Sequence, residues 1–303
     1  MALLFIFVMV GYILMKLRVV PENSGAVLSK LENNLFTPAS ILSTFITGFT
    51  VASLSSAWQF VLLGTVVTAI GIPVALFVAR LVTRDSYIRK IYTYGLAFSN
   101  FGFMGNAVVQ NVYGDTVYMK YLIFVIPFWV AIYGWGVPAL LMPGGEDVSV
   151  KQRMKNILNP MLIATVLGMI IGISGIPVPG FINRAISTLG ACMSPLAMIL
   201  TGMAIAKIDI KESFKNGKAY IISAVRLIAL PLVFIALLYP IPMAYELKLC
   251  AVCAVSMPLG LSTIVVPGGY GLDTRVASGM TMISHLLSCI TIPLIFMLFE
   301  FLF

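Results

Sequence analysis

Apolar runs long enough to cross a lipid bilayer follow one another along almost the whole chain. A spanning helix needs ~20 mostly apolar residues. Ten such helices are expected, at about 2–18, 29–52, 57–81, 90–112, 116–140, 157–175, 183–206, 215–239, 246–269 and 274–302. Only 10% of the 303 residues are charged and 60% are hydrophobic, whereas roughly a quarter of the residues of a soluble domain are charged. The sequence therefore predicts an all-α polytopic membrane protein.

The distribution of Lys and Arg among the connecting segments predicts the orientation, because cytoplasmic loops carry the excess of basic residues. With the N-terminus outside, the external connections hold only Lys120, Arg184 and Lys248. The cytoplasmic connections then hold Lys16, Arg18, Lys30, Arg80, Arg84, Arg89, Lys90, Lys151, Arg153, Lys155, Lys207, Lys211, Lys215, Lys218 and Arg275. This bias predicts a multi-pass protein of the cytoplasmic (inner) membrane with both termini extracytoplasmic. The net charge of +8 follows from these scattered residues, and without a basic stripe it predicts no nucleic-acid partner.

The sequence consists of two related halves. A polar linker, 142–156, separates a first five-helix repeat, 1–141, from a second, 157–303. The segment 113–116 reads Tyr-Gly-Asp-Thr and is echoed by Tyr-Gly-Leu-Asp-Thr at 270–274, and Pro73 precedes Pro231 by 158 residues. Because five is odd, the second repeat must enter the membrane from the opposite side. Inverted repeats of this kind are typical of secondary transporters.

Two matching segments, 97–106 and 254–263, place glycine, proline and small polar residues in the middle of apolar runs. Irregular backbone at membrane depth is tolerated only where it is buried in protein or lines a cavity. If both helices are broken there, the N-terminal ends of their second halves offer free N–H groups and partial positive charge to a small anion. The expected binding residues are Asn100, Gly102, Gly105, Asn106, Pro258, Gly260, Ser262 and Thr263. The alternative is that these glycines and prolines serve helix packing.

Three ionisable residues within apolar segments are further candidates, because such residues are expensive in a membrane. Arg226 would either bind the anion or serve as a structural partner of backbone carbonyls. His285, the only histidine, would either carry a coupling proton or be a hydrogen-bonded interior residue. Glu32 would either carry a proton or cap the start of its helix.

With these residues identified, the whole chain resembles bacterial members of the auxin efflux carrier family. The resemblance rests on residues 100–105 (Asn-Phe-Gly-Phe-Met-Gly), on 257–263 (Met-Pro-Leu-Gly-Leu-Ser-Thr), on the two Tyr-Gly endings and on the run 284–293. It implies a fold similar to that of bile-acid symporters, with a scaffold part and a mobile transport part that contains two crossed broken helices. It also implies carboxylate substrates, either auxin-like or dicarboxylates such as malate and malonate, contacted by Asn100 and Pro258. This chain departs from the family in having Asn106-Ala107 where a proline usually follows the glycine.

We therefore expect a secondary active or facilitative carrier that moves a small organic anion by alternating access. The alternative is an anion channel or gated pore built from the same broken helices. An enzyme is disfavoured, because no HExxH motif and no paired intramembrane carboxylates are present. We expect no cofactor and no metal, since the Cys250–Cys253 pair lacks a second pair. The expected partners are the anion and membrane lipids, and a homodimer is left open.

Overall fold

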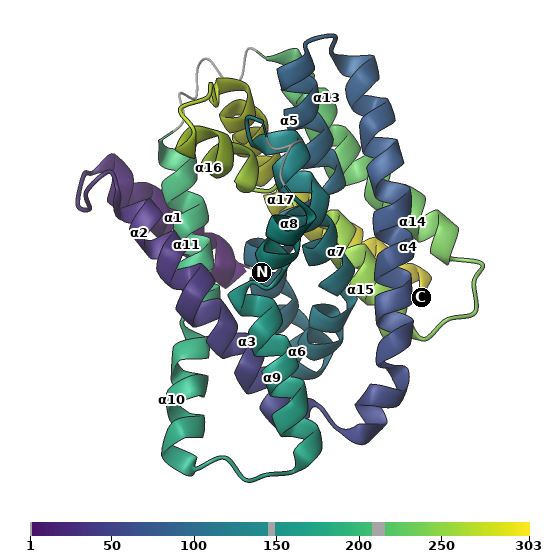
Figure 1. The fold of residues 1–303 in the computed structure, drawn as a ribbon. Helices are drawn as coiled ribbons and strands as arrows, with labels where there is room; N and C mark the ends of the chain where they lie inside the picture. The colour runs from purple at the N-terminus through teal and green to yellow at the C-terminus, as the bar shows by residue number, and fades with distance from the viewer. Residues whose placement is uncertain (1, 145–148, 208–215) are drawn as a thin grey trace. The chain divides into compact units, whose positions relative to one another are not determined.

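A computed structural model describes residues 2–144, 149–207 and 216–303, and these residues form helices joined by short connections (Figure 1). No strand is present in these three ranges. The predicted cytoplasmic residues Lys211 and Lys215, and part of the linker 142–156, lie outside the described residues. The helices divide between two compact units, which are taken in turn.

The first unit comprises Met1–Phe60, Gly102–Ile123 and Leu158–Lys207. Its helices are α1 (Ala2–Lys16), α2 (Ser24–Leu31), the π-helical turn η1 (Glu32–Phe36), α3 (Thr37–Gly48), α9 (Pro160–Ser174), α10 (Gly180–Ala191) and α11 (Met193–Ala206). Most of the π-helical turn η2 (Phe101–Gly105) and of α6 (Asn106–Phe124) also belongs to it. The helix predicted to begin near residue 29 begins earlier, at Ser24, and runs through η1 into α3.

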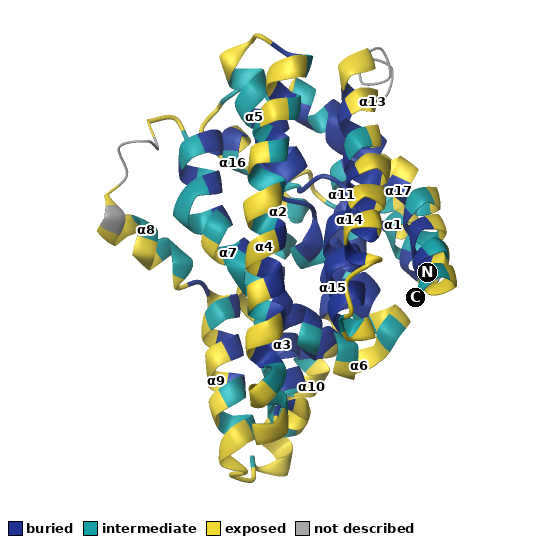
Figure 2. Ribbon diagram, turned by 90° about the vertical axis from the view of Figure 1, so that its right-hand side faces the viewer, coloured by how far each residue is buried: buried dark blue, intermediate teal, exposed yellow. Residues whose placement is uncertain are grey.

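The second unit comprises Val61–Phe101, Phe124–Ile157 and Ile208–Phe303. It contains most of α4 (Val51–Val82), then α5 (Ser86–Ala97), α7 (Ile126–Ala131), the π-helical turn η3 (Ile132–Leu141) and α8 (Val150–Ile157). It continues with α13 (Gly217–Ala224), the π-helical turn η5 (Val225–Ala229), α14 (Leu230–Leu238), α15 (Tyr245–Ser256), α16 (Ser262–Gly269) and α17 (Arg275–Leu302). Helix α15 is the centre of this unit, because every residue from Leu247 to Ser256 is buried (Figure 2).

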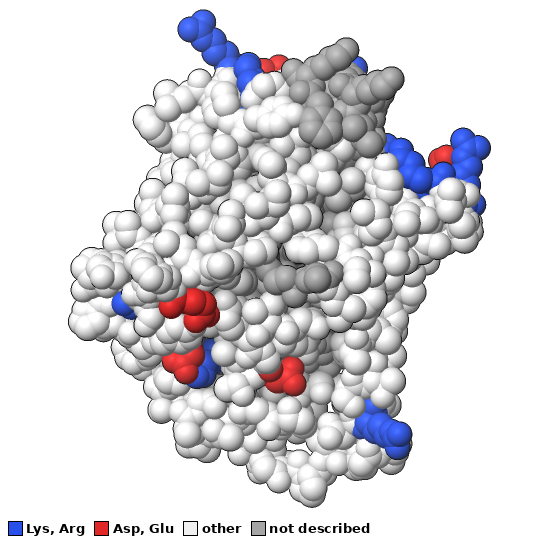
Figure 3. All heavy atoms as spheres, turned by 180° about the vertical axis from the view of Figure 1, so that it is seen from behind, with Lys and Arg blue, Asp and Glu red and all other residues white. Residues whose placement is uncertain are grey.

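Several helices expose apolar side chains instead of burying them. Trp58, Phe77 and Leu81 on α4 are 60%, 63% and 70% exposed, and α4 is largely yellow in Figure 2. Charged side chains are sparse on the face drawn in Figure 3. A large exposed apolar surface with few charges suits contact with lipid.

Five described helical stretches are long and apolar enough to cross a membrane: Val51–Val82, Phe101–Leu141, Gly180–Ala206, Gly217–Leu238 and Arg275–Leu302. A sixth is reached if Lys151–Ile157 and Pro160–Ser174, bent by 60°, count as one span. The remaining predicted segments are interrupted or short. Helices α5 and α15 have 12 residues each, so each is ~18 Å long, well short of the ~30 Å hydrocarbon core.

In the first unit, α1 and α11 pack backbone to backbone through two glycines. A Cβ atom added to Gly11 would overlap the carbonyl oxygen of Ile199, and one added to Gly202 would overlap that of Val8. Small residues allow this close approach, which is a common way for helices to associate in membranes.

We expect Gly202→Val to destabilise the protein by at least about 1–3 kcal/mol, because the added methyl groups must displace the backbone of α1. The measurement is the apparent melting temperature of the purified, detergent-solubilised protein. Gly71→Ala is the control, since a Cβ at Gly71 meets no atom within 4 Å. Equal melting temperatures for both variants would show that the α1–α11 contact is unimportant for stability.

Candidate functional site

Both predicted helix interruptions are present, and both lie in the second unit. Helix α5 ends at Ala97 and η2 begins only at Phe101; α15 ends at Ser256 and α16 begins only at Ser262. Pro258 explains the second interruption, because proline lacks an N–H group and pushes the preceding residue out of the helical region. Met257 is accordingly extended, with φ −72° and ψ 149°.

The two interruptions cross and hydrogen-bond to each other. Ser99 and Leu259 form an antiparallel bridge, and the amide of Asn100 donates to the carbonyl of Pro258 at 2.7 Å. The Ser99 hydroxyl donates to the carbonyl of Ala254, also at 2.7 Å. Backbone groups freed by one interruption are thus satisfied by the other, which is what an apolar environment requires.

The side chain of Asn100 is held by His285. Nδ1 of His285 lies 2.8 Å from the carbonyl of Thr281, and its Nε2 lies 3.1 Å from Nδ2 of Asn100. A carbonyl can only accept, so Nδ1 carries the proton and Nε2 accepts from the Asn100 amide. This arrangement fits the interior, hydrogen-bonded alternative for His285, because both ring nitrogens of the neutral imidazole are in use.

Arg226 fits the structural alternative of the sequence analysis. It lies in η5 and is buried, and its guanidinium donates to the carbonyls of Leu96 (2.8 Å), Ala254 (3.2 Å) and Met257 (3.2 Å). These carbonyls lie at the C-terminal ends of α5 and α15, where intrahelical partners are missing and the helix dipole is negative. The guanidinium therefore clamps both half-helices at the crossover.

The N-terminus of α16 provides backbone donors beside the crossover. Among the described residues, the amides of Leu261 and Ser262 donate no hydrogen bond, whereas the Gly260 amide belongs to the bridge between the two interruptions. Thr263 is buried, and its hydroxyl donates to the carbonyl of Gly260 at 2.8 Å and lies 3.3 Å from the Thr281 hydroxyl. Ser262 is only partly buried and its hydroxyl lies beside that of Tyr94. Four of the predicted residues, Pro258, Gly260, Ser262 and Thr263, thus share one turn of chain.

Four other predicted residues belong to the first unit. Gly102 and Gly105 lie in η2, directly after Phe101 in the chain. Asn106 begins α6 and is 1% exposed, yet neither its amide nitrogen nor its amide oxygen has a partner among the described residues. Glu32 does not cap a helix start, because the helix begins at Ser24 and Glu32 lies inside it, in η1.

Two residues that position the crossover were not predicted from the sequence. Ser284 accepts a hydrogen bond from the amide of Leu259 at 3.2 Å and donates to the carbonyl of Thr281 at 2.9 Å. Tyr94 is buried under the crossover and packs on Phe98 with ring centroids 5.1 Å apart. The only available signal was the position of Ser284 next to His285.

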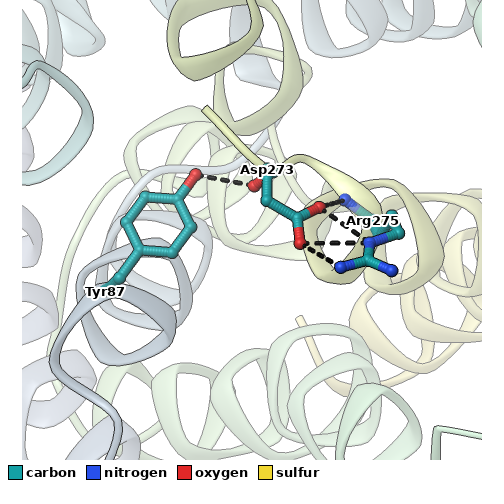
Figure 4. Close-up of polar contacts among 3 residues, drawn as sticks. All are labelled: Tyr87, Asp273 and Arg275. Atoms are coloured by element: carbon teal, nitrogen blue, oxygen red, sulfur yellow. Dashed lines mark hydrogen bonds and ion pairs between the residues drawn. The ribbon is translucent and has the colours of Figure 1, made fainter. Parts of the chain in front are cut away.

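The connection between α16 and α17 is tied to the start of α5 (Figure 4). Tyr87 donates to the backbone carbonyl of Asp273 at 2.7 Å. The Asp273 carboxylate accepts from the Arg275 amide at 2.9 Å and pairs with its guanidinium at 2.7 Å. These bonds hold the pKa of Asp273 at about 2, below its ordinary 3.8.

We expect this pair to contribute little to stability, because its side chains are 75% and 51% exposed and solvent screens such pairs. A lowered pKa means that the contribution is full above pH 3.8 and is lost as the pH falls towards about 2. Melting temperatures of wild-type and Asp273→Asn protein should therefore differ slightly near neutral pH and converge at the acid end. A difference that persists undiminished below pH 2 would contradict this explanation.

The long exposed apolar helices, the sparse charges and the buried hydrogen-bonded crossover together define an all-α, multi-pass membrane protein. The family model described as "Membrane transport protein" matches residues 1–296, and the chain belongs to that family. The resemblance to the auxin efflux carriers is thereby confirmed. An uncharacterized transporter of Methanothermobacter thermautotrophicus (strain Delta H) is 25% identical over 293 residues, covering 95% of this chain and 94% of the relative. Family and relative both indicate a transporter rather than an enzyme.

Proposed function

We propose that this protein is a secondary carrier of small organic anions, with the carboxylate bound at the crossover of the second unit. The observation that carries the proposal is the pair of donor amides of Leu261 and Ser262, directly after the crossed segments. Amides at a helix N-terminus are suited to a carboxylate. Asn100 and the hydroxyl of Ser262 add neutral donors at the same place.

The proposed architecture is ten spanning segments in two inverted repeats, 1–141 and 157–303. Gly114 and Gly271, 157 residues apart in the sequence, both have left-handed backbone, with φ 80° and 71°. The first compact unit combines Met1–Phe60 with Leu158–Lys207, which are corresponding parts of the two repeats, whereas the repeat counterpart of its segment Gly102–Ile123 belongs to the second unit. Such a division supports a scaffold part and a separate transport part, as the family resemblance implies.

In this mechanism the neutral donors bind the anion, and one unit moves against the other to expose it to either side. With the cell interior negative, expelling a monovalent anion is favoured by about 2.3 kcal/mol per 100 mV. Export therefore needs no coupled ion, whereas uptake does. We place the carrier in the cytoplasmic membrane with both termini outside, on the Lys and Arg bias.

The test is a thermal-shift screen of purified protein against malonate, malate, succinate and indole-3-acetate, with malonamide as the uncharged control. A ligand that binds the folded state raises its apparent stability. We expect at least one carboxylate, and not malonamide, to raise the melting temperature and to show saturable counterflow in proteoliposomes. Single-channel currents without counterflow would show that the protein is a pore and not a carrier. Stabilisation by malonamide equal to that by malonate would refute carboxylate recognition.

A further inference from the structure

A buried carboxyl group in the first unit has no role in the crossover. Glu32 lies in η1 and is 0% exposed. Its Oε1 accepts a hydrogen bond from the Thr37 hydroxyl at 2.9 Å. Its Oε2 is buried and has no hydrogen-bond partner among the described residues. π-Helical turns of this kind frequently mark functional positions.

Two further unsatisfied hydroxyls accompany this carboxyl group. Ser40 follows Glu32 by eight residues, which places it two turns further along the same helix face. The hydroxyl of Tyr118, from α6, lies beside Ser40 and interacts electrostatically with Glu32. Ser40 and Tyr118 are buried, and neither hydroxyl has a hydrogen-bond partner within the described chain. The group therefore contains three oxygen atoms with unused hydrogen-bonding capacity.

No cationic side chain of the surrounding helices faces Glu32. The elements packed against η1 are α2, α3, α9, α10 and α11. Helices α3, α9 and α11 contain no titratable residue, and the basic residues of α2 and α10, Lys30 and Arg184, are exposed. Of the charged residues of α6, Asp115 is an anion, and Lys120 is partly exposed and lies two positions from Tyr118, on a different face of the helix. A buried carboxylate without a cationic partner is costly, so a positive charge must reach it from solution.

We propose that Glu32 is a proton-binding site of the first unit. The step takes one proton from solution and converts the carboxylate into an uncharged carboxylic acid, with Oε1 still accepting from the Thr37 hydroxyl. Among the described residues, no group of three or more His, Cys, Asp or Glu side chains could hold a metal ion, and Glu32 is a single carboxyl group. A proton needs only one acceptor and one hydrogen-bond partner.

The sequence offered two candidates for a proton-coupling residue, His285 and Glu32, and the structure favours Glu32. The ring nitrogens of His285 are both engaged in the neutral state, whereas Glu32 has an oxygen that a proton completes. If the proposed carrier function holds, Glu32 is the residue that links transport to a pH gradient. Proton binding itself does not depend on that function.

The first experiment is infrared spectroscopy of the purified protein without any anion. We expect a carboxylic acid C=O band near neutral pH in the wild type, its retention in Glu22→Gln, and its loss in Glu32→Gln. Glu22 is the matched control because it is exposed and lies ten positions upstream. Tyr118→Phe should shift the band without removing it. An unchanged band in Glu32→Gln, or sodium-22 binding that Glu32→Gln abolishes, would overturn the proposal.

The second experiment uses proteoliposomes and radiolabelled malonate as the probe. Wild-type uptake should increase several-fold under an imposed inward proton gradient, whereas Glu32→Gln should retain counterflow and lose this response. If wild-type malonate uptake does not respond to the proton gradient, coupling through Glu32 is refuted, but the proposed carrier function is not. Absence of any malonate counterflow together with a normal infrared band would refute malonate transport and leave the proton site standing.

Discussion

Arg226→Met is expected to cause the largest loss of stability of any single substitution at the crossover. The guanidinium satisfies the carbonyls of Leu96, Ala254 and Met257. Each buried carbonyl left without a partner costs about 1–3 kcal/mol, so the combined loss should exceed ~3 kcal/mol. A melting temperature lowered by many degrees, or failure to purify as a monodisperse protein, is the expected result.

Thiol-reactive dye labelling measures this effect, because Cys250 and Cys253 are buried and react only on unfolding, above the constant signal of the exposed Cys192. Arg226→Lys is the matched variant. It keeps the charge but lacks the fork-shaped donor group that contacts several acceptors at once, so it should be intermediate. If Arg226→Met labels like the wild type but binds malonate more weakly, the guanidinium belongs to the anion and not to the carbonyls.

Asn100→Ala is expected to reduce anion binding by more than tenfold and to lower the melting temperature less than Arg226→Met does, since it leaves one buried group unsatisfied instead of three. The backbone contact from Asn100 to Pro258 does not require the side chain. The lost amide removes a neutral donor at the crossover and frees Nε2 of His285. Removal of one hydrogen bond to a charged group costs about 1.5–3 kcal/mol, which is roughly a 10- to 150-fold loss of affinity.

The measurement is the concentration of the stabilising carboxylate needed for half-maximal thermal shift. Asn111→Ala is the control, because Asn111 is a buried-side amide of the first unit that bonds to Ser194 and the Ala107 carbonyl. It should leave the affinity unchanged. If Asn100→Ala binds the carboxylate with wild-type affinity, the crossover is not part of the binding site.

The sequence allowed the interruptions to be predicted, because glycine and proline report local backbone conformation. Pro258, with Gly260 two residues later, disfavours a continuous helix, and Gly114 and Gly271 allow left-handed turns. The direction of the Arg226 side chain could not be predicted in the same way. Its acceptors come from α5 and α15, 28 to 130 residues away, and nothing in the local sequence specifies them.

The same limit applies to Glu32 and His285. Glu32 precedes an Asn-Asn pair that resembles a helix start, so a capping role was a reasonable alternative, but tertiary packing extends the helix back to Ser24. The His285 tautomer depends on Thr281, one turn earlier, and on Asn100, 185 residues away. The ten-segment, inverted-repeat architecture and the substrate stay predictions of the sequence, supported by the repeat-related glycines.

The antiparallel bridge between Ser99 and Leu259, with the Arg226 clamp behind it, joins the two unwound segments into one stiff body. An anion bound to such a body contacts the same groups whether the site opens to the inside or to the outside of the cell. Under the proposed carrier mechanism, its dissociation constant should then be equal on the two sides of the bilayer.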